Sequence, residues 1–555
     1  MDLQIPTLHK RSRQDFDTSP AAIRQWIADL PLVNADKTAE ELLNALNAMN
    51  GLQIPARDRL EDLEQLAVPV ASVIQTLSRQ YLGKRLPLDS KSQARADLAS
   101  SLHLQMATGY KIVAAELSSK RRSGMQLGQA IHAATRHLGE ALLNSYTLYA
   151  PCPAGIWRDL HGLYELALAR GLEEENTGEI TAASEGTVSI AGRYRQCLLL
   201  SLAIPYRMRQ REIRSVYTLL ADWAPYCRLH TPGDRNAVGH FACNLDADEP
   251  PRYLQHEQRD RLDSRQLVID TSGLEEPVRA TITAQQESTA RLSTLPDPAA
   301  LQRLMLSWGM MPKRRFPRRG NESRVQLVLG LSAIHHALGG SDKPAPAGRA
   351  AGHESVQDDQ YLRDPTFERT TVIDTMPVNK TDAINPFRGS YSPGSGGSDG
   401  DLRIEAWKMQ DMSAGGYCLL WDSAETTNAH VGELVAISED GGDKDWHLGV
   451  VRWMRFTAAE GLSLGVQMLS PGARPVWASL CKDQAGMEDR MQGILLPEVV
   501  ALDQPATLLL PPLPFHTGCL STVSEADSET TVRLTGHIED TGSFTQFLFA
   551  AGDAG

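Results

Sequence analysis

The chain has 555 residues, of which 42% are hydrophobic and 22% are charged. This composition is typical of globular proteins and excludes a wholly disordered or fibrous chain. Fifty-five Lys and Arg against 68 Asp and Glu give a formal net charge of −13, so we expect neither a nucleic-acid polymer as partner nor insertion into an anionic membrane. At about 150 residues per domain, the length predicts three to four folding units.

The sequence contains no strong signal for export or for a membrane anchor. Its apolar runs fall short of the ~18 residues that a spanning helix needs, and the N-terminus lacks the charged-then-apolar pattern of a secretory signal. Seven cysteines are an odd and sparse set, which argues against a disulfide framework. These features predict a cytoplasmic protein.

Residues 1–227 are predicted to form an α-helical bundle that serves in docking or scaffolding. Apolar residues recur there at helical spacing, and prolines at positions 151, 153 and 205 lie between the runs, where they can end helices. The runs are marked by Leu98, Leu102, Met106, Val113 and Leu117; by Leu138, Leu142, Tyr146 and Tyr149; by Trp157, Leu160, Tyr164 and Leu168; and by Ile213, Tyr217, Leu220 and Trp223.

The rest of the chain is predicted to be mainly β, which makes the fold class α+β multidomain. A mixed connecting segment is expected over 228–300, with short strands at 241–245 and 268–269, and a helix is expected over 298–308. A β-barrel domain is expected over 301–485 and a smaller C-terminal β module over 486–555, because short alternating segments are separated by Gly and Asp turns. The polar, Gly-rich stretch at about 340–400 is predicted to be a mobile insertion.

A compact cationic segment interrupts this acidic chain at residues 312–324. It holds six basic residues against one acid, a local charge of +5 that leaves −18 on the remainder. Such an island favours a small anionic ligand over a polyanion, whereas the simpler alternative is a solvated basic loop. The basic residues are Lys313, Arg314, Arg315, Arg318, Arg319 and Arg324.

Two short motifs give the island a more specific meaning. Residues 314–319 contain Arg-x-x-x-Arg, and Asp411, Ser413 and Gly416 form Asp-x-Ser-x-x-Gly. Together with the strand patterns His-Leu-Gly-Val-Val-Arg-Trp at 447–453 and Leu-Gly-Val-Gln at 464–467, they resemble the PilZ domain of bacterial cyclic-di-GMP receptors. This arrangement resembles the larger, atypical members of that family that carry an N-terminal helical domain; the resemblance is specific over about 310–485 and weaker over the first ~230 residues.

The resemblance implies that cyclic-di-GMP is the ligand, with no other cofactor. Guanidinium groups can fork onto phosphate oxygens or onto a guanine edge and can stack on a purine. Asp411 would accept hydrogen bonds from guanine, Ser413 would add a hydroxyl contact, and Gly416 would permit a close backbone approach. The expected ligand-binding residues are Arg314, Arg315, Arg318, Arg319, Asp411, Ser413 and Gly416.

The spacing of the two motifs departs from a simple PilZ domain, because Arg318 and Asp411 lie 93 residues apart. Both can still belong to one barrel if the insertion leaves and re-enters it between adjacent strands. Which arginine pair faces the ligand, Arg314 with Arg318 or Arg315 with Arg319, stays open. The simpler interpretation is that residues 314–319 are a basic linker and that Asp411–Gly416 is an ordinary turn between strands.

A weaker pattern concerns metal. Cys227, His230, His240 and Cys243 form Cys-x-x-His…His-x-x-Cys, whose four side chains could hold tetrahedral Zn²⁺. Their order matches no standard zinc motif, and buried cysteine is commonly a small apolar residue, so no metal is predicted. The sequence also lacks the P-loop, esterase-elbow and zincin motifs, which leaves enzymatic activity unsupported.

These observations predict a bacterial cyclic-di-GMP receptor or adaptor. The PilZ-like domain would bind the dinucleotide, and the helical domain would relay binding to an unidentified protein partner. The alternative is a non-binding PilZ-like scaffold that acts only through protein–protein contacts. The output pathway, the ligand stoichiometry and the oligomeric state do not follow from the sequence.

Overall fold

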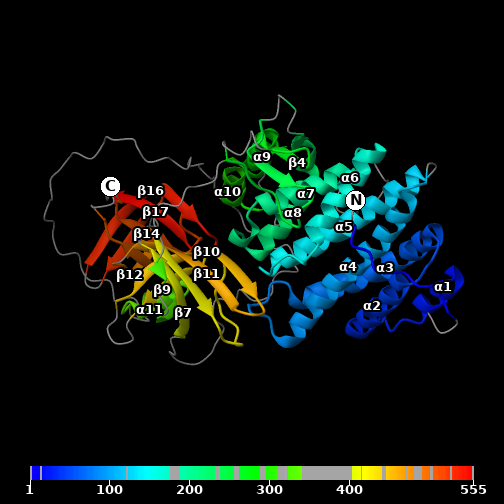
Figure 1. Cartoon of the computed structure of the whole chain (residues 1–555). Coiled ribbons are helices and arrows are strands. Elements are labelled where there is room, and N and C mark those ends of the chain that lie inside the picture. Colours follow the sequence, from blue (N-terminus) through cyan, green and yellow to red (C-terminus); the bar gives the residue numbers. More distant parts are fainter. Residues whose placement is uncertain are drawn as a thin grey trace.

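The chain consists of a helical domain followed by two β-barrels (Figure 1). A small mixed α/β segment, which lies between them in sequence, packs against α6 (Ile156–Arg170) and α7 (Ile190–Leu202) of the helical domain. A computed structural model describes residues 3–552 except 13–15, 121–122, 176–187, 232–233, 235–237, 256–261, 288–295, 310–318, 321–322, 341–402, 414, 440–444, 471, 481–489, 500–503 and 526–527. The predicted insertion at about 340–400 therefore lies almost wholly outside the described residues.

The helical domain confirms the predicted bundle. The second apolar run lies in α5, which ends just before the prolines at 151 and 153, and side chains such as Asn34 and Asp89 cap the helices that follow them by accepting from backbone N–H groups. The helices are α1 (Pro20–Ala28), α2 (Ala35–Gly51), α3 (Ala56–Tyr81), α4 (Ser90–Leu117), α5 (Gly124–Thr147), α6 (Ile156–Arg170), α7 (Ile190–Leu202) and α8 (Gln210–Trp223), with the short 3-10 turns η1 (Pro205–Arg207) and η2 (Ala224–Tyr226).

The connecting segment folds as a four-stranded sheet with two helices. The strands are β1 (Arg228–His230), β2 (Phe241–Asn244), β3 (Arg252–Tyr253) and β4 (Gln266–Asp270), in the order β1-β4-β2-β3, and η4 (Ser272–Leu274), α9 (Glu275–Glu287) and α10 (Pro298–Gly309) follow. Asp248, after β2, accepts from the backbone N–H groups of Gly155 and Trp157 at the start of α6. This contact fixes the sheet to the helical domain.

The middle barrel is a closed ring of six strands with a two-residue strand added at one edge. Its ring order is β7-β6-β9-β10-β11-β8, closed by pairing of β8 with β7, and β5 also pairs with β7. The helix α11 (Leu331–Ala337) follows β6. The strands are β5 (Arg319–Gly320), β6 (Arg324–Leu329), β7 (Glu405–Ser413), β8 (Gly416–Trp421), β9 (Leu434–Ser438), β10 (His447–Thr457) and β11 (Gly461–Ser470).

The C-terminal barrel is also closed, in the order β12-β13-β14-β17-β16-β15. Its first strand begins at residue 474, twelve residues before the expected start of the C-terminal module at 486. The strands are β12 (Arg474–Leu480), β13 (Met491–Leu496), β14 (Thr507–Leu510), β15 (Leu520–Glu525), β16 (Ser528–Asp540) and β17 (Thr545–Ala551).

Apolar packing connects all three parts. One cluster of buried side chains runs from the helical domain into the interior of the middle barrel, where it includes Trp407 and Val466. A second cluster lies between the two barrels and includes Val450 of the middle barrel and Phe544 of the C-terminal barrel. Helix α11 contributes Ile334 to this second cluster, so the outer surface of the middle barrel near β9 and β10 is covered by the C-terminal barrel.

Candidate functional site

The Asp-x-Ser-x-x-Gly motif forms the hairpin between β7 and β8. Asp411 pairs with Cys418, and Ser413 pairs with Gly416, in the antiparallel ladder. Ser413 donates its hydroxyl proton to the carbonyl oxygen of Gly416 at 3.4 Å. Asp411, Ser413 and Gly416 are all half-buried, so the motif lies at the surface of the barrel rather than in its core.

Gly416 has a structural requirement of its own. Its φ is +154°, and a Cβ at this position would lie 1.9 Å from the carbonyl oxygen of Val466 on β11. A larger residue would therefore separate β8 from β11. Glycine is needed here to close the barrel, whether or not the hairpin binds a ligand.

The end of the cationic segment 312–324 lies beside this hairpin, although Arg318 and Asp411 are 93 residues apart in sequence. Arg319 of β5 pairs with Met412, and Gly320 pairs with Asp411, on the edge of β7 opposite β8. Directly paired residues share a face of the sheet, so the exposed Arg319 lies on the Met412 side and Asp411 on the other. Arg314, Arg315 and Arg318 lie outside the described residues.

The outer face of the barrel carries a row of residues that sequence analysis did not assign to the site. Asp411 on β7, Cys418 on β8, Gly465 on β11 and Trp453 on β10 are consecutive ladder partners. The two middle residues are small, and the indole of Trp453 lies against Gly465, where a Cβ would come within 1.9 Å of Nε1. Because the indole covers Gly465, only Cys418 separates it from Asp411 along the row.

The adjacent row reaches the C-terminal barrel. Ser413, Gly416 and Gln467 are consecutive partners on β7, β8 and β11. Gln467 is exposed, and its Oε1 accepts from Nε of Arg452 at 2.7 Å. Arg452, in turn, forms a bidentate ion pair with Glu539 of β16, with 2.8 Å between Nη2 and Oε2.

A second junction joins all three domains around Arg209, at the start of α8. Its Nε donates to the carbonyl of Val431 in the middle barrel at 3.1 Å, and its Nη2 donates to Oγ of Ser543 in the C-terminal barrel at 2.8 Å. His430 lies 3.0 Å from the same Oγ and 3.1 Å from Glu433. The pKa of His430 lies below its usual value, mainly because of burial. Glu433 opposes this shift, whereas the nearby Arg209 and Arg211 add to it.

The helical domain contacts the barrel through strained backbone. Tyr149 and Ile204 have φ of +56° and +53°, which is costly for residues with a large side chain. The carbonyl of Tyr149 accepts from the N–H of Phe456 on β10 at 2.8 Å, and η1, directly after Ile204, packs against β10. Strain therefore lies where the helical domain meets the strand that carries Arg452 and Trp453.

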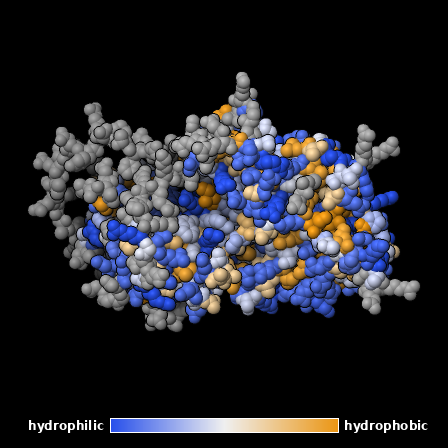
Figure 2. Space-filling view, viewed as in Figure 1, coloured by the Kyte–Doolittle hydropathy of each residue, from blue (hydrophilic) through white to orange (hydrophobic). Residues whose placement is uncertain are grey.

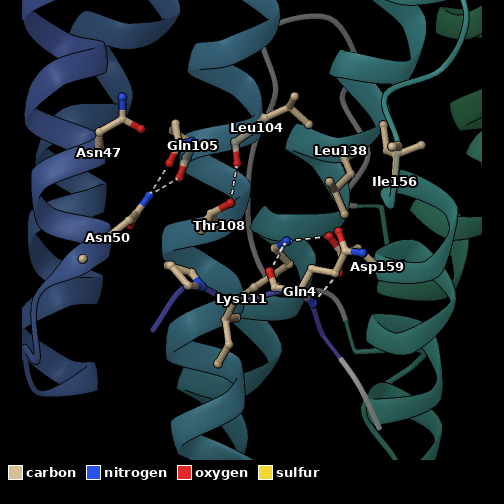
Figure 3. Close-up of a pocket in the computed structure, with 14 residues that line it drawn as sticks. Gln4, Asn47, Asn50, Leu104, Gln105, Thr108, Lys111, Leu138, Ile156 and Asp159 are labelled. Atoms are coloured by element: carbon tan, nitrogen blue, oxygen red, sulfur yellow. Dashed lines mark hydrogen bonds and ion pairs between the residues drawn. The ribbon is translucent and has the colours of Figure 1, made fainter. Parts of the chain in front are cut away.

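The helical domain also contains a polar cavity of about 470 Å³, shown in Figure 3. Lys111 and Asp159 form a buried ion pair of 2.5 Å beside it, and both side chains bind the backbone of Gln4. Burial raises the pKa of Asp159, while Lys111 opposes that rise. The Lys111–Asp159 pair holds the N-terminal segment between α4 and α6. Of the predicted ligand-binding residues that the structure describes, none lines the cavity.

The zinc pattern is not assembled. Cys227 and Cys243 are buried in the apolar core, with Cys243 next to the hydroxyl of Tyr194, whereas His230 pairs with Asp234 and His240 stacks on Tyr253. Within the described ranges, no group of three or more His, Cys, Asp or Glu side chains could hold a metal ion. Burial raises the pKa of both thiols, which disfavours the thiolate form that binds a metal ion.

Among the helices that the structure describes, none combines the length and apolar composition needed to cross a membrane.

Comparisons with known proteins cover nearly the whole chain. Residues 21–234 match the N-terminal domain of the cyclic-di-GMP receptor FimW, residues 240–475 match its middle PilZ domain, and residues 476–551 match its C-terminal β-barrel domain. A curated relative from Pseudomonas aeruginosa, named Cyclic-di-GMP receptor FimW, is 29% identical over 582 aligned residues, which cover 100% of this chain and 94% of the relative. No solved structure matches. The family is one of receptors rather than enzymes, and this chain belongs to it: it is a member of the FimW cyclic-di-GMP receptor family.

Proposed function

We propose that this chain binds cyclic-di-GMP on the outer face of the middle barrel and relays binding to a protein partner through the helical domain. Pairing of Gly320 with Asp411 carries the proposal, because it brings the chain that follows the arginine segment 314–319 alongside the strand of Asp411 and Ser413. Guanidinium groups would bind phosphate or guanine, and the carboxylate of Asp411 would accept from the guanine N1–H and amino group.

The contacts between domains support a relay. Helix α8 begins at Arg209, which binds both barrels, and η1 packs against β10 at the border of the ligand face. Ligand would shift the helical domain only if it bound one inter-domain arrangement better than another. Stored strain at Tyr149 and Ile204 is consistent with a junction that has two such arrangements.

The helical domain also offers surface for a partner. Large apolar side chains are exposed on it, and Figure 2 shows apolar residues gathered over the helical part of the viewed face. Exposed apolar surface of this kind is typical of protein–protein contact sites. The exposed residues include Leu32, Val33, Val68 and Met125.

Titration calorimetry with cyclic-di-GMP tests the binding step on the full chain. We expect saturable binding by the wild type and a loss of at least about tenfold in affinity for Asp411→Ala, the effect of one charge-assisted contact. Separate Arg314→Ala/Arg318→Ala and Arg315→Ala/Arg319→Ala variants identify the arginine pair. Two results would overturn this site and favour the scaffold alternative. One is the absence of binding heat with the wild type, and the other is unchanged affinity in both arginine variants.

The relay has its own test. A partner captured with the full chain in the presence of cyclic-di-GMP should be lost from Asp411→Ala but retained by the control Glu529→Gln, whose side chain pairs with Arg490 within the C-terminal barrel. Equal capture with and without the dinucleotide would show that the helical domain acts independently of the ligand.

A further inference from the structure

We propose that the dinucleotide site extends across the outer face from β7 to β10, and that Arg452 exchanges its ion pair with Glu539 for a ligand phosphate. This inference rests on the proposed function, because it extends the same site. Arg452, which lies outside both motifs, would contact the ligand. Loss of its ion pair would release the C-terminal barrel from one contact with the middle barrel.

Continuity of the surface is the first argument. Ser413, Gly416 and Gln467 are successive ladder partners, and Gln467 binds Arg452 directly. Neighbouring strands lie about 4.8 Å apart, so the path from β7 through β8 and β11 to β10 spans about 14 Å. A ligand with two nucleotide units and two phosphates can engage both ends of such a surface.

The chemistry along this path suits a cyclic dinucleotide. The indole of the half-buried Trp453 covers Gly465 and lies next to the small residue Cys418, so it offers a surface on which a base can stack. The guanidinium of Arg452 is planar and can fork onto phosphate oxygens as it now forks onto Glu539. Phosphate and carboxylate therefore compete for the same donor geometry.

The local charge and exposure make exchange feasible. Arg452 and Glu539 are 31% and 19% exposed, so the pair is open to solvent and to ligand. Burial lowers the pKa of Arg207 in η1, and the positive charge of the nearby Arg452 lowers it further. Two guanidinium groups against one carboxylate leave an excess of positive charge at the border of the ligand face.

Arg452 and Glu539 lie at the edge of the interface between the two barrels, so loss of their ion pair would affect that interface. Both residues lie next to a register shift, Arg452 in β10 and Glu539 in β16, where a bulge directs a side chain away from the regular ladder. Val450, two residues before Arg452, is buried in the cluster between the barrels. Transfer of Arg452 to the ligand would remove a bidentate contact at the rim of this interface and loosen the C-terminal barrel there.

Calorimetry with cyclic-di-GMP on the full chain tests the exchange. Glu539→Gln removes the competitor and should tighten binding about three- to tenfold, whereas Arg452→Ala should weaken it about tenfold. Glu529→Gln is the matched control, because Glu529 pairs with Arg490 in the same barrel, and its affinity should equal that of the wild type. Thermal melting of each variant checks that the fold is retained.

A second measurement follows the release itself. Amide hydrogen exchange at residues 537–540 of β16 should rise when cyclic-di-GMP binds to the wild type and should be unchanged by ligand in Arg452→Ala. If Glu539→Gln binds like the wild type and ligand leaves exchange in β16 unaltered, the extension is wrong although the motif site stands. If the wild type itself does not bind, the proposed function fails first. Should Arg452→Ala not fold, Glu539→Gln alone decides the matter.

Discussion

The two barrels have the same number of ring strands but differ in what is added to the ring. The middle barrel has an extra strand, β5, which brings Arg319 to the hairpin of Asp411 and Ser413, and a register shift between Met409 and Asp411. The C-terminal barrel has no added strand among its described residues, and its register shifts lie in β16, which contributes Glu539 to one junction while Ser543 contributes to the other. The comparison indicates that the added strand distinguishes the barrel with the binding motif, whereas irregular strands occur in both barrels.

The largest effect is expected where the middle barrel's ring is tightest. Gly416→Ala would place a Cβ against the carbonyl of Val466 and should destabilise the protein by on the order of 3 kcal/mol, with loss of cyclic-di-GMP binding. Gly472→Ala, at the start of the C-terminal barrel, is the control, because its Cβ would meet only Pro497 at 3.8 Å. Thermal and denaturant unfolding measure both. A Gly416→Ala protein as stable as the control would remove the structural reason for this glycine.

The fold was largely predictable because its periodic signals are long. The stripes of α4, α5, α6 and α8 extend over several turns, and the alternation in β10 and β11 covers most of each strand. Short elements left no such signal. Strand β5 has two residues and helix α11 has seven.

The site was less predictable than the fold because it depends on register. Asp411, Ser413 and Gly416 form a local motif, but Trp453 and Gln467 join them only through pairing across four strands that includes two register shifts. A one-residue slip would have turned these side chains to the other face. Spacing was also ambiguous for the pattern of Cys227, His230, His240 and Cys243, for which no metal was predicted; only the fold shows that Cys243 lies in the apolar core.

The next largest effect tests whether the C-terminal barrel couples to the helices. Arg209→Ala removes donors to Val431 and Ser543 and should destabilise the assembly by about 2 kcal/mol. It should also increase proteolytic cleavage between the helical domain and the barrels. Arg57→Ala, an exposed arginine at the start of α3, should behave like the wild type. Equal protease resistance of the two variants would mean that apolar packing alone joins the domains.

A smaller effect should appear as a pH dependence of the same junction. Burial lowers the pKa of His430, with Glu433 opposing and Arg209 and Arg211 reinforcing the shift. A histidine whose folded pKa is depressed stabilises the fold fully above its usual value of 6.5, and this contribution is lost as pH falls below that value. His430→Gln should therefore melt with a shallower decline between pH 7.5 and about 5 than the wild type. His103 and His137 share the sign of the shift, so only the difference between the two proteins isolates His430.

The smallest effect compares two ion pairs of the C-terminal barrel. Arg490 and Glu529 lie within it and are 14% and 36% exposed, whereas Glu539 reaches across to Arg452 of the middle barrel. Double-mutant cycles on unfolding should give coupling energies of about 1 kcal/mol or less for both pairs without ligand, since partly exposed pairs gain little over solvation. With saturating cyclic-di-GMP, the Arg452–Glu539 coupling should fall toward zero and the Arg490–Glu529 coupling should not change. A coupling energy of several kcal/mol for Arg452–Glu539, with and without ligand, would contradict the exchange. The ion pair would then hold the two barrels together permanently, because breaking it would cost more free energy than a phosphate contact supplies.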